Sequence, residues 1–149
     1  MSESASTVSD AARQPTGPLG ILSLHHVSRT TTDLEASLGF YVDLLGFQPL
    51  RRPPFSFRGA WLYGYGLQIH LIEREADASP LPIEPRRDHI AFRVADIEAV
   101  IARFQAHDIQ FVERVNAGGI RQIFIADPDG HQLEFAVVPE PTRGYEGAE

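Results

Sequence analysis

The sequence predicts an α+β protein made of two tandem βαβββ modules, because one pattern of residues occurs twice. Asp33 follows His26 by seven residues, and Asp96 follows His89 at the same interval. The ends of the two halves also align: Gly66-Leu67-Gln68-Ile69-His70-Leu71 matches Gly130-His131-Gln132-Leu133-Glu134-Phe135. The repeat is roughly 63 residues long, and each half contains one stretch with helical spacing among stretches of strand type.

The first module opens with a predicted strand and a helix. Residues Ile21 to Arg29 alternate in polarity, as expected for a half-buried strand. Asp33 is a good N-cap for a helix whose apolar residues recur at helical spacing up to Leu45, and Gly46 suits its C′ position. Three strands follow, with a break at Pro53-Pro54 and a hairpin at Gly64-Tyr65-Gly66: Phe47 to Arg51, Phe57 to Tyr63 and Leu67 to Glu73.

The second module repeats this order after a proline-rich linker. Asp96 is the predicted cap of a helix that runs to about His107, and Asp127-Pro128-Asp129-Gly130 has the signature of a type I turn. The predicted strands are Asp88 to Val94, Ile109 to Arg114, Ile120 to Ala126 and His131 to Val138. We therefore expect a disordered tail over 1–20, one domain over 21–138 (module one 21–75, linker 76–85, module two 86–138) and a C-terminal tail over 139–149.

Composition narrows the functional classes. A chain of 149 residues corresponds to one domain, and 43% hydrophobic residues with 22% charged residues are ordinary for a globular protein. The net charge of −7 argues against nucleic acid or an anionic membrane as partner, since both favour clustered Lys and Arg. There is no cysteine to form disulfides or thiolate ligands, and the N-terminal residues contain no apolar run. A cytoplasmic location is the default expectation.

Four residues of metal-ligand type occupy matched places in the repeat: His26, His70, His89 and Glu134. Successive strand residues point to opposite faces, so each predicted sheet has an apolar back for its helix and a front that carries these side chains. A lone histidine in a strand is more often a surface or satisfied core residue, but agreement in register across a repeat favours ligands. Three imidazoles and a carboxylate suit Fe, Ni, Zn, Co or Mn as a divalent ion, with open positions for substrate or water.

Other polar and aromatic residues are candidates for neighbouring roles. Gln68 and Gln132 share the ligand faces, where they could contact substrate, orient ligands or be ordinary satisfied amides. Trp61 and Arg51 are candidate substrate contacts, against the alternatives of core packing and solvated charge. The remaining residues are predicted to be structural or to lie behind the ligands, with the turn carboxylates capping backbone groups: His25, His107, His131, Asp127 and Asp129.

These motifs resemble the vicinal oxygen chelate superfamily, which includes glyoxalase I, fosfomycin-resistance proteins, extradiol dioxygenases and bleomycin-resistance proteins. The resemblance rests on His26-Val27-Ser28, Phe40-Tyr41-Val42-Asp43-Leu44-Leu45-Gly46-Phe47, Asp88-His89-Ile90-Ala91-Phe92 and Asp127-Pro128-Asp129-Gly130-His131-Gln132-Leu133-Glu134. The glyoxalase-I-like subgroup of plants and bacteria is most similar, through Arg51-Arg52-Pro53, Gly59-Ala60-Trp61-Leu62 and Ile69-His70-Leu71. The resemblance implies mixed sheets that form a cup around a metal, to which a small substrate binds through two adjacent oxygens.

By the same resemblance His26, His89 and Glu134 match ligand positions shared by most members, whereas His70 stands where glyoxalase I has a glutamate. We expect a metal-dependent, glyoxalase-like lyase or isomerase in which Glu134 is also the catalytic base. The alternatives are an Fe(II)-dependent extradiol-type dioxygenase and a non-catalytic small-molecule or antibiotic-binding resistance protein. A homodimer is expected, and the ligands of one site could come from one chain or from two.

Overall fold

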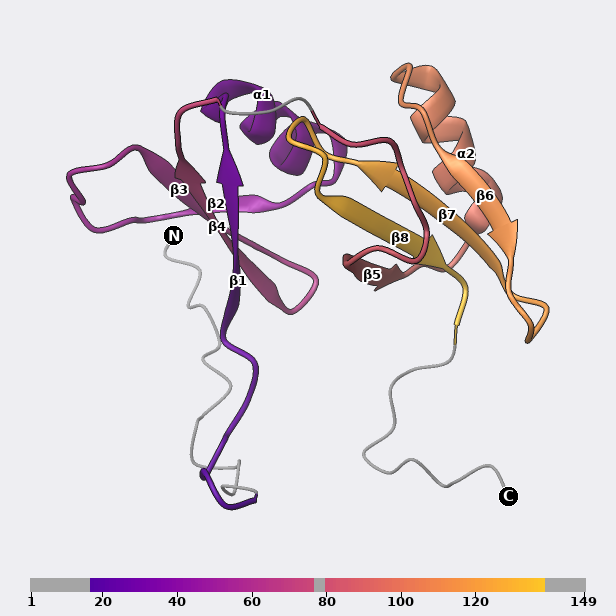
Figure 1. The fold of residues 1–149 in the computed structure, drawn as a ribbon, viewed down its shortest axis with the longest axis horizontal. Helices are drawn as coiled ribbons and strands as arrows, with labels where there is room; N and C mark the ends of the chain where they lie inside the picture. Colours follow the sequence, from indigo (N-terminus) through magenta and orange to yellow (C-terminus); the bar gives the residue numbers. More distant parts are fainter. Residues whose placement is uncertain (1–16, 77–79, 139–149) are drawn as a thin grey trace, which may run out of the picture.

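Two four-stranded mixed sheets, one from each module, make up the fold in the computed structural model, which describes residues 17–76 and 80–138 (Figure 1). The first sheet has the order β1-β4-β3-β2, and its module contains β1 (His26–Thr31), α1 (Leu34–Leu38), the π-helix η2 (Gly39–Leu44), β2 (Gln48–Leu50), β3 (Gly59–Gly64) and β4 (Leu67–Glu73). The second has the order β5-β8-β7-β6, and its module contains β5 (His89–Arg93), α2 (Ile97–Ala106), β6 (Val112–Val115), β7 (Arg121–Ala126) and β8 (Gln132–Ala136). The predicted α+β class with tandem βαβββ modules is confirmed.

The strand register makes the two modules equivalent. In both sheets the first and last strands of the module run parallel, and the other neighbours are antiparallel. The matched parallel pairs are His26–Gln68 and Ser28–His70 in the first sheet, and His89–Gln132 and Ala91–Glu134 in the second. The repeat in the sequence is therefore a repeat in space.

Local signals in the sequence set the helix ends. The Asp33 side chain accepts a hydrogen bond from the backbone of Ala36, and Asp96 accepts from the first-turn amides of α2. Gly46 has a φ of +87°, which favours glycine over any residue with a Cβ. The first helix differs from the prediction in one respect: it widens into the π-helix η2, in which the Leu45 amide donates to the Phe40 carbonyl.

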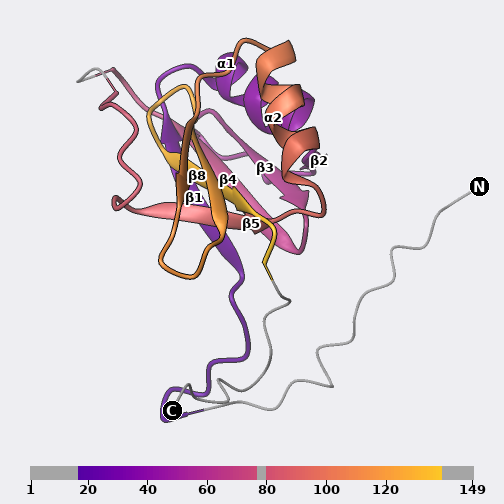
Figure 2. The ribbon, with the colours of Figure 1, turned by 90° about the vertical axis from the view of Figure 1, so that its right-hand side faces the viewer.

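The first strand begins later than predicted. Residues 21–25 run out from the body of the molecule, where Leu24 is 75% exposed, and regular pairing with β4 starts only at His26 (Figure 2). The other strands differ from the predictions by a few residues at their ends, as is usual for element boundaries.

One apolar core lies between the modules and joins the backs of both sheets to the helices. It contains Leu62, Ile69 and Leu71 from the first sheet, Ile123, Ile125 and Leu133 from the second, and Leu34, Phe40, Tyr41, Leu44, Phe47, Phe104 and Phe135 around them. Helices α1 and α2 lie at the same end of the molecule (Figures 1 and 2). Because strand residues alternate, the faces with the candidate ligands point away from this shared core.

The turn between β7 and β8 fastens module two onto module one. Tyr41 donates to Asp127 Oδ2 at 2.7 Å, and both the amide and the hydroxyl of Thr32 donate to Asp129 Oδ1. Asp127 Oδ1 also accepts from the backbone amides of Asp129 and His131, which confirms that the turn carboxylates cap backbone groups.

The predicted tails over 1–20 and 139–149 fall outside the described residues, apart from a turn at 17–20. Of the predicted linker over 76–85, residues 76 and 80–85 are described, and they contain neither helix nor strand. Within the described ranges no helix is both long enough and apolar enough to cross a lipid bilayer.

Candidate metal centre and substrate site

Module one brings His26 and His70 together on the front of its sheet. Their imidazole rings stack with centroids 3.9 Å apart and an interplanar angle of 10°. The indole of Trp61, on the neighbouring strand β3, stacks on the other face of His70 at 4.4 Å. This sandwich fixes the plane of the His70 ring, so only the nitrogens at the ring edge can coordinate a metal ion.

The surroundings of His70 favour a neutral imidazole, the form that binds metal. Burial lowers the pKa of His70, and the neighbouring His26 and His25 lower it further. His70 Nε2 lies 3.1 Å from Gln68 Oε1, so Gln68 contacts a candidate ligand directly. His25 Nδ1 lies 2.8 Å from His26 Nδ1, so His25 contacts a candidate metal ligand, and its role behind the ligands stays a prediction.

Module two brings His89 and Glu134 together on the front of the second sheet. His89 Nε2 lies 3.0 Å from Glu134 Oε2, and His89 Nδ1 lies 2.8 Å from the carbonyl of Arg87. When Nδ1 donates to that carbonyl, Nε2 is the nitrogen left to face the carboxylate or a metal ion. Glu134 is only 7% exposed, so its carboxylate depends on partners within the protein.

Gln122, which is not among the residues predicted from the sequence, supplies such a partner. Its amide nitrogen donates to Glu134 Oε1 at 2.6 Å, and its own Oε1 is buried without a hydrogen-bond partner among the described residues. The sequence does contain a signal for Gln122: strand alternation places Gln122 and Phe124 on the same face of the sheet as Glu134. The matching position in module one is Gly59, so this contact occurs only at the His89–Glu134 pair; we call this pair and the His26–His70 pair the two half-sites.

The four predicted ligands thus form two pairs, one on the front of each sheet. Within residues 17–76 and 80–138, no three His, Asp or Glu side chains are grouped so that they could hold one metal ion. A four-ligand site within a single chain, one of the two arrangements that the sequence left open, is therefore absent from this part of the protein. The assignment of these residues as ligands stays a prediction.

The other three residues predicted to contact substrate lie in surroundings that differ from one another. Gln132 Oε1 accepts from the Glu84 amide at 2.6 Å, so this side chain holds the linker against β8. Trp61 packs against a ligand candidate, as described above, and Arg51 is exposed. A direct contact of Gln132, Trp61 or Arg51 with substrate stays a prediction.

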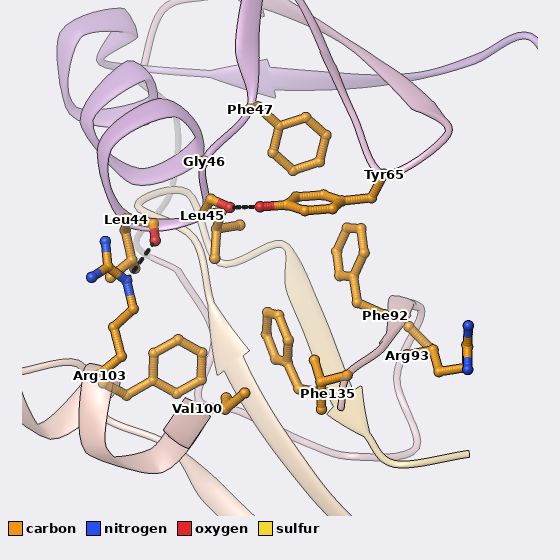
Figure 3. Close-up of a pocket in the computed structure, with 13 residues that line it drawn as sticks. Leu44, Leu45, Gly46, Phe47, Tyr65, Phe92, Arg93, Val100, Arg103 and Phe135 are labelled. Atoms are coloured by element: carbon orange, nitrogen blue, oxygen red, sulfur yellow. Dashed lines mark hydrogen bonds between the residues drawn. The ribbon is translucent and has the colours of Figure 1, made fainter. Parts of the chain in front are cut away.

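A separate cavity of about 660 Å³ lies on the core side, between the modules (Figure 3). Its lining is mainly aromatic and aliphatic, and Tyr65, Phe92 and Phe135 point into it from both modules. Arg103 also lines the cavity and donates to the carbonyl of Leu44 at 3.0 Å. None of the four candidate ligands lines this cavity, so it is distinct from both half-sites.

The fold is therefore of the duplicated βαβββ class, with a His–His pair on the front of one sheet and a His–Glu pair on the front of the other, and comparison with known proteins shows the family. The sequence model of the Glyoxalase/Bleomycin resistance protein/Dioxygenase superfamily matches residues 23–135, and the chain belongs to that family. "Glyoxylase I 4" of Arabidopsis thaliana is 39% identical over 125 residues, covering 79% of this chain and 72% of that protein.

Two more relatives show the range of the family. "Glutathione transferase FosA" of Serratia marcescens is 32% identical over 117 residues, covering 77% of this chain and 80% of that protein. The crystal structure of a glyoxalase family protein from Enterococcus faecalis aligns with a TM-score of 0.64 and 30% identity, covering 76% of this chain and 96% of that one. Relatives with different reactions share this fold, so the reaction has to be argued from the site itself.

Proposed function

We propose that this protein is a metal-dependent enzyme of glyoxalase-like type, which acts on a small oxygenated substrate chelated to a divalent metal ion. The main support is the pair His89–Glu134, in which Nε2 of the exposed His89 lies 3.0 Å from Oε2 of the buried Glu134 on the front of the second sheet. The family match and the similarity to a glyoxalase I protein support the same class. His26, His70, His89 and Glu134 would hold the metal, and this donor set fits Fe, Ni, Zn, Co or Mn.

A bound divalent ion would act as a Lewis acid that polarises the substrate oxygens. The protein's own contribution is then to orient the substrate and to move a proton. Glu134 is the proposed base, because its carboxylate is the acidic group of the site and can take a proton from one substrate carbon and return it to the next. The amide of Gln122 holds the Glu134 carboxylate in place at 2.6 Å.

We further propose that two chains complete each site. The front of module one carries two imidazoles, the front of module two carries an imidazole and a carboxylate, and the shared core separates the two fronts of one chain. A two-fold homodimer in which module one of each chain faces module two of its partner would form two identical sites. Each site would then contain three histidines and one glutamate.

Mixed dimers test this arrangement. One variant lacks the first pair (His26→Ala with His70→Ala) and the other lacks the second pair (His89→Ala with Glu134→Ala), so neither homodimer should bind stoichiometric metal. Co-expressed, they should regain about a quarter of the wild-type metal content, since half the dimers are mixed and each mixed dimer has one intact site out of two. A mixture that stays free of metal would refute shared sites. Wild-type protein without metal would instead favour the non-catalytic binding protein.

The second candidate function is an Fe(II)-dependent dioxygenase. It is favoured by the contact of His70 Nε2 with Gln68, which could keep His70 from the metal and leave His26, His89 and Glu134 as a two-histidine, one-carboxylate set. Oxygen consumption that depends on Fe(II) and on a catechol would establish this reaction. Turnover of thiol adducts of α-ketoaldehydes without oxygen consumption would establish the glyoxalase-like function.

A further inference from the structure

A row of aromatic rings leads outward from the first histidine pair. Trp61, which stacks on His70, lies 6.0 Å from the ring of Phe55, and Phe55 stacks on Phe57 at 5.2 Å with an interplanar angle of 16°. The guanidinium of Arg52 lies 4.8 Å and 4.9 Å from the centroids of these two phenylalanine rings. We refer to Phe55, Phe57 and Arg52 together as the aromatic shelf.

The aromatic shelf is ordered yet open to solvent. Arg52 donates to the Phe57 carbonyl at 2.8 Å, and a Cβ at Gly59 would come within 3.2 Å of its guanidinium, so the arginine is held closely against the chain. Phe55 and Phe57 are nevertheless 45% and 44% exposed. Two adjacent exposed phenylalanines beside a candidate reaction centre indicate a contact surface rather than part of the core.

The fold itself does not require the aromatic shelf. It lies in the connection between β2 and β3, and module two makes the equivalent connection, between β6 and β7, with Asn116-Ala117-Gly118-Gly119-Ile120, which contains no aromatic residue. Both sheets are nevertheless paired in the same way. The shelf is therefore an addition to module one, placed next to the histidine pair.

We propose that the aromatic shelf binds a planar, π-conjugated, negatively charged end of the substrate. The half-exposed phenylalanine rings favour stacking with another π system, and Arg52 has no carboxylate partner among the described residues, so it can pair with an anion. This inference rests on the proposed function in one respect: the rest of the same substrate would reach the histidine pair along Trp61.

Two matched probes separate stacking from chelation. Phenylglyoxylate and cyclohexylglyoxylate carry the same charge and the same adjacent oxygens, and only the first has a planar ring. Calorimetric titration of the full-length protein should show phenylglyoxylate binding about 3- to 10-fold more tightly, the equivalent of one stacking interaction. The single tryptophan of the chain, Trp61, reports the location, because only a ligand beside it should quench its emission.

Variants assign the effect to the shelf. Phe57→Leu keeps the apolar bulk and should abolish the preference for the phenyl probe, whereas Arg52→Gln should weaken both probes several-fold. Tyr65→Leu, which alters an exposed aromatic residue outside the shelf and the histidine pair, is the matched control and should keep the preference. Equal affinity of the wild-type protein for the two probes, or a preference that survives in Phe57→Leu, would overturn the proposal.

Repeating the titrations with added Ni(II) and with EDTA distinguishes this proposal from the proposed function. The ratio of the two affinities measures the contribution of stacking on the aromatic shelf, whereas a dependence on Ni(II) common to both probes measures the contribution of the metal site. A phenyl preference without any effect of Ni(II) would support the shelf and refute the metal-dependent function. An effect of Ni(II) without a phenyl preference would support the metal-dependent function and refute binding at the aromatic shelf.

Discussion

Replacing Tyr41 by Phe should destabilise the protein by about 1.5–3 kcal/mol at neutral pH, the usual value of a hydrogen bond to a charged group. Tyr41 is fully buried, Asp127 is 5% exposed, and the hydroxyl donates to Asp127 Oδ2 at 2.7 Å. The substitution keeps the ring and its edge-on contacts with Phe40 and Phe47. The expected loss is therefore that of one hydrogen bond to a buried carboxylate, free of a cavity effect.

The pH dependence identifies the cause. Burial raises the pKa of Asp127 in the folded protein, and the hydrogen bond from Tyr41 opposes that rise. Because the folded pKa is raised, the stability that Asp127 contributes is fully present below its unfolded pKa and is lost as the pH rises through the folded pKa. Tyr41→Phe raises the folded pKa further, so the variant should lose more stability at neutral pH and approach the wild type in acid.

Urea unfolding between pH 4 and pH 8 measures this difference in the free energy of unfolding. In an Asp127→Asn background the same tyrosine substitution should cost clearly less, because the buried charge is gone. A cost below about 0.5 kcal/mol, or one that does not change with pH, would show that the Tyr41 hydroxyl does not stabilise the Asp127 carboxylate.

Three further outcomes are expected. Under the proposed function, Gln122→Ala should weaken metal binding about 10- to 100-fold, and it should also lower the thermal stability of the metal-free protein, because the buried Glu134 carboxylate loses a hydrogen-bond donor; unchanged affinity in a metal titration would contradict that role. Gly46→Ala should cost roughly 1–2 kcal/mol, since φ is +87° and a Cβ would meet the Tyr65 hydroxyl at 2.8 Å, whereas Gly118→Ala, without a positive φ, serves as the control in thermal unfolding. Asp96→Ala should cost about 1 kcal/mol in the same assay through loss of the helix cap, and Asp96→Asn should restore most of it.

Local chemistry made much of the fold predictable. A capping carboxylate needs only the amides two and three residues further on, so Asp33 and Asp96 mark their helix starts from sequence alone. The hairpin at Tyr65-Gly66 follows for a similar reason, since φ is +55° and +79° there and a two-residue turn of this type favours glycine. The π-helix was not predictable, because the apolar spacing around Tyr41 fits an α-helix and a π-helix alike.

The candidate site was predictable in its parts but not in its assembly. Strand periodicity and the repeat identified His26 and His70 as neighbours on one face, and His89 and Glu134 on another. Which faces meet is decided elsewhere, by long-range contacts such as Tyr41 with Asp127, for which the sequence contains no spacing rule. The repeat also suggested equal roles for Gln68 and Gln132, yet only Gln68 contacts a candidate ligand.

The divergence of the two modules bears on how a dimer would use them. In a two-fold dimer the fronts can meet either unlike with unlike or like with like. Like with like would place four imidazoles in one site and two His–Glu pairs in the other, and one of the two sites would lack the carboxylate base. Unlike pairing gives each site one base from module two and one aromatic shelf from module one. The two modules differ at the positions that the proposed reaction uses: module one has His70 and the aromatic shelf, and module two has Glu134. This difference supports pairing between unlike modules.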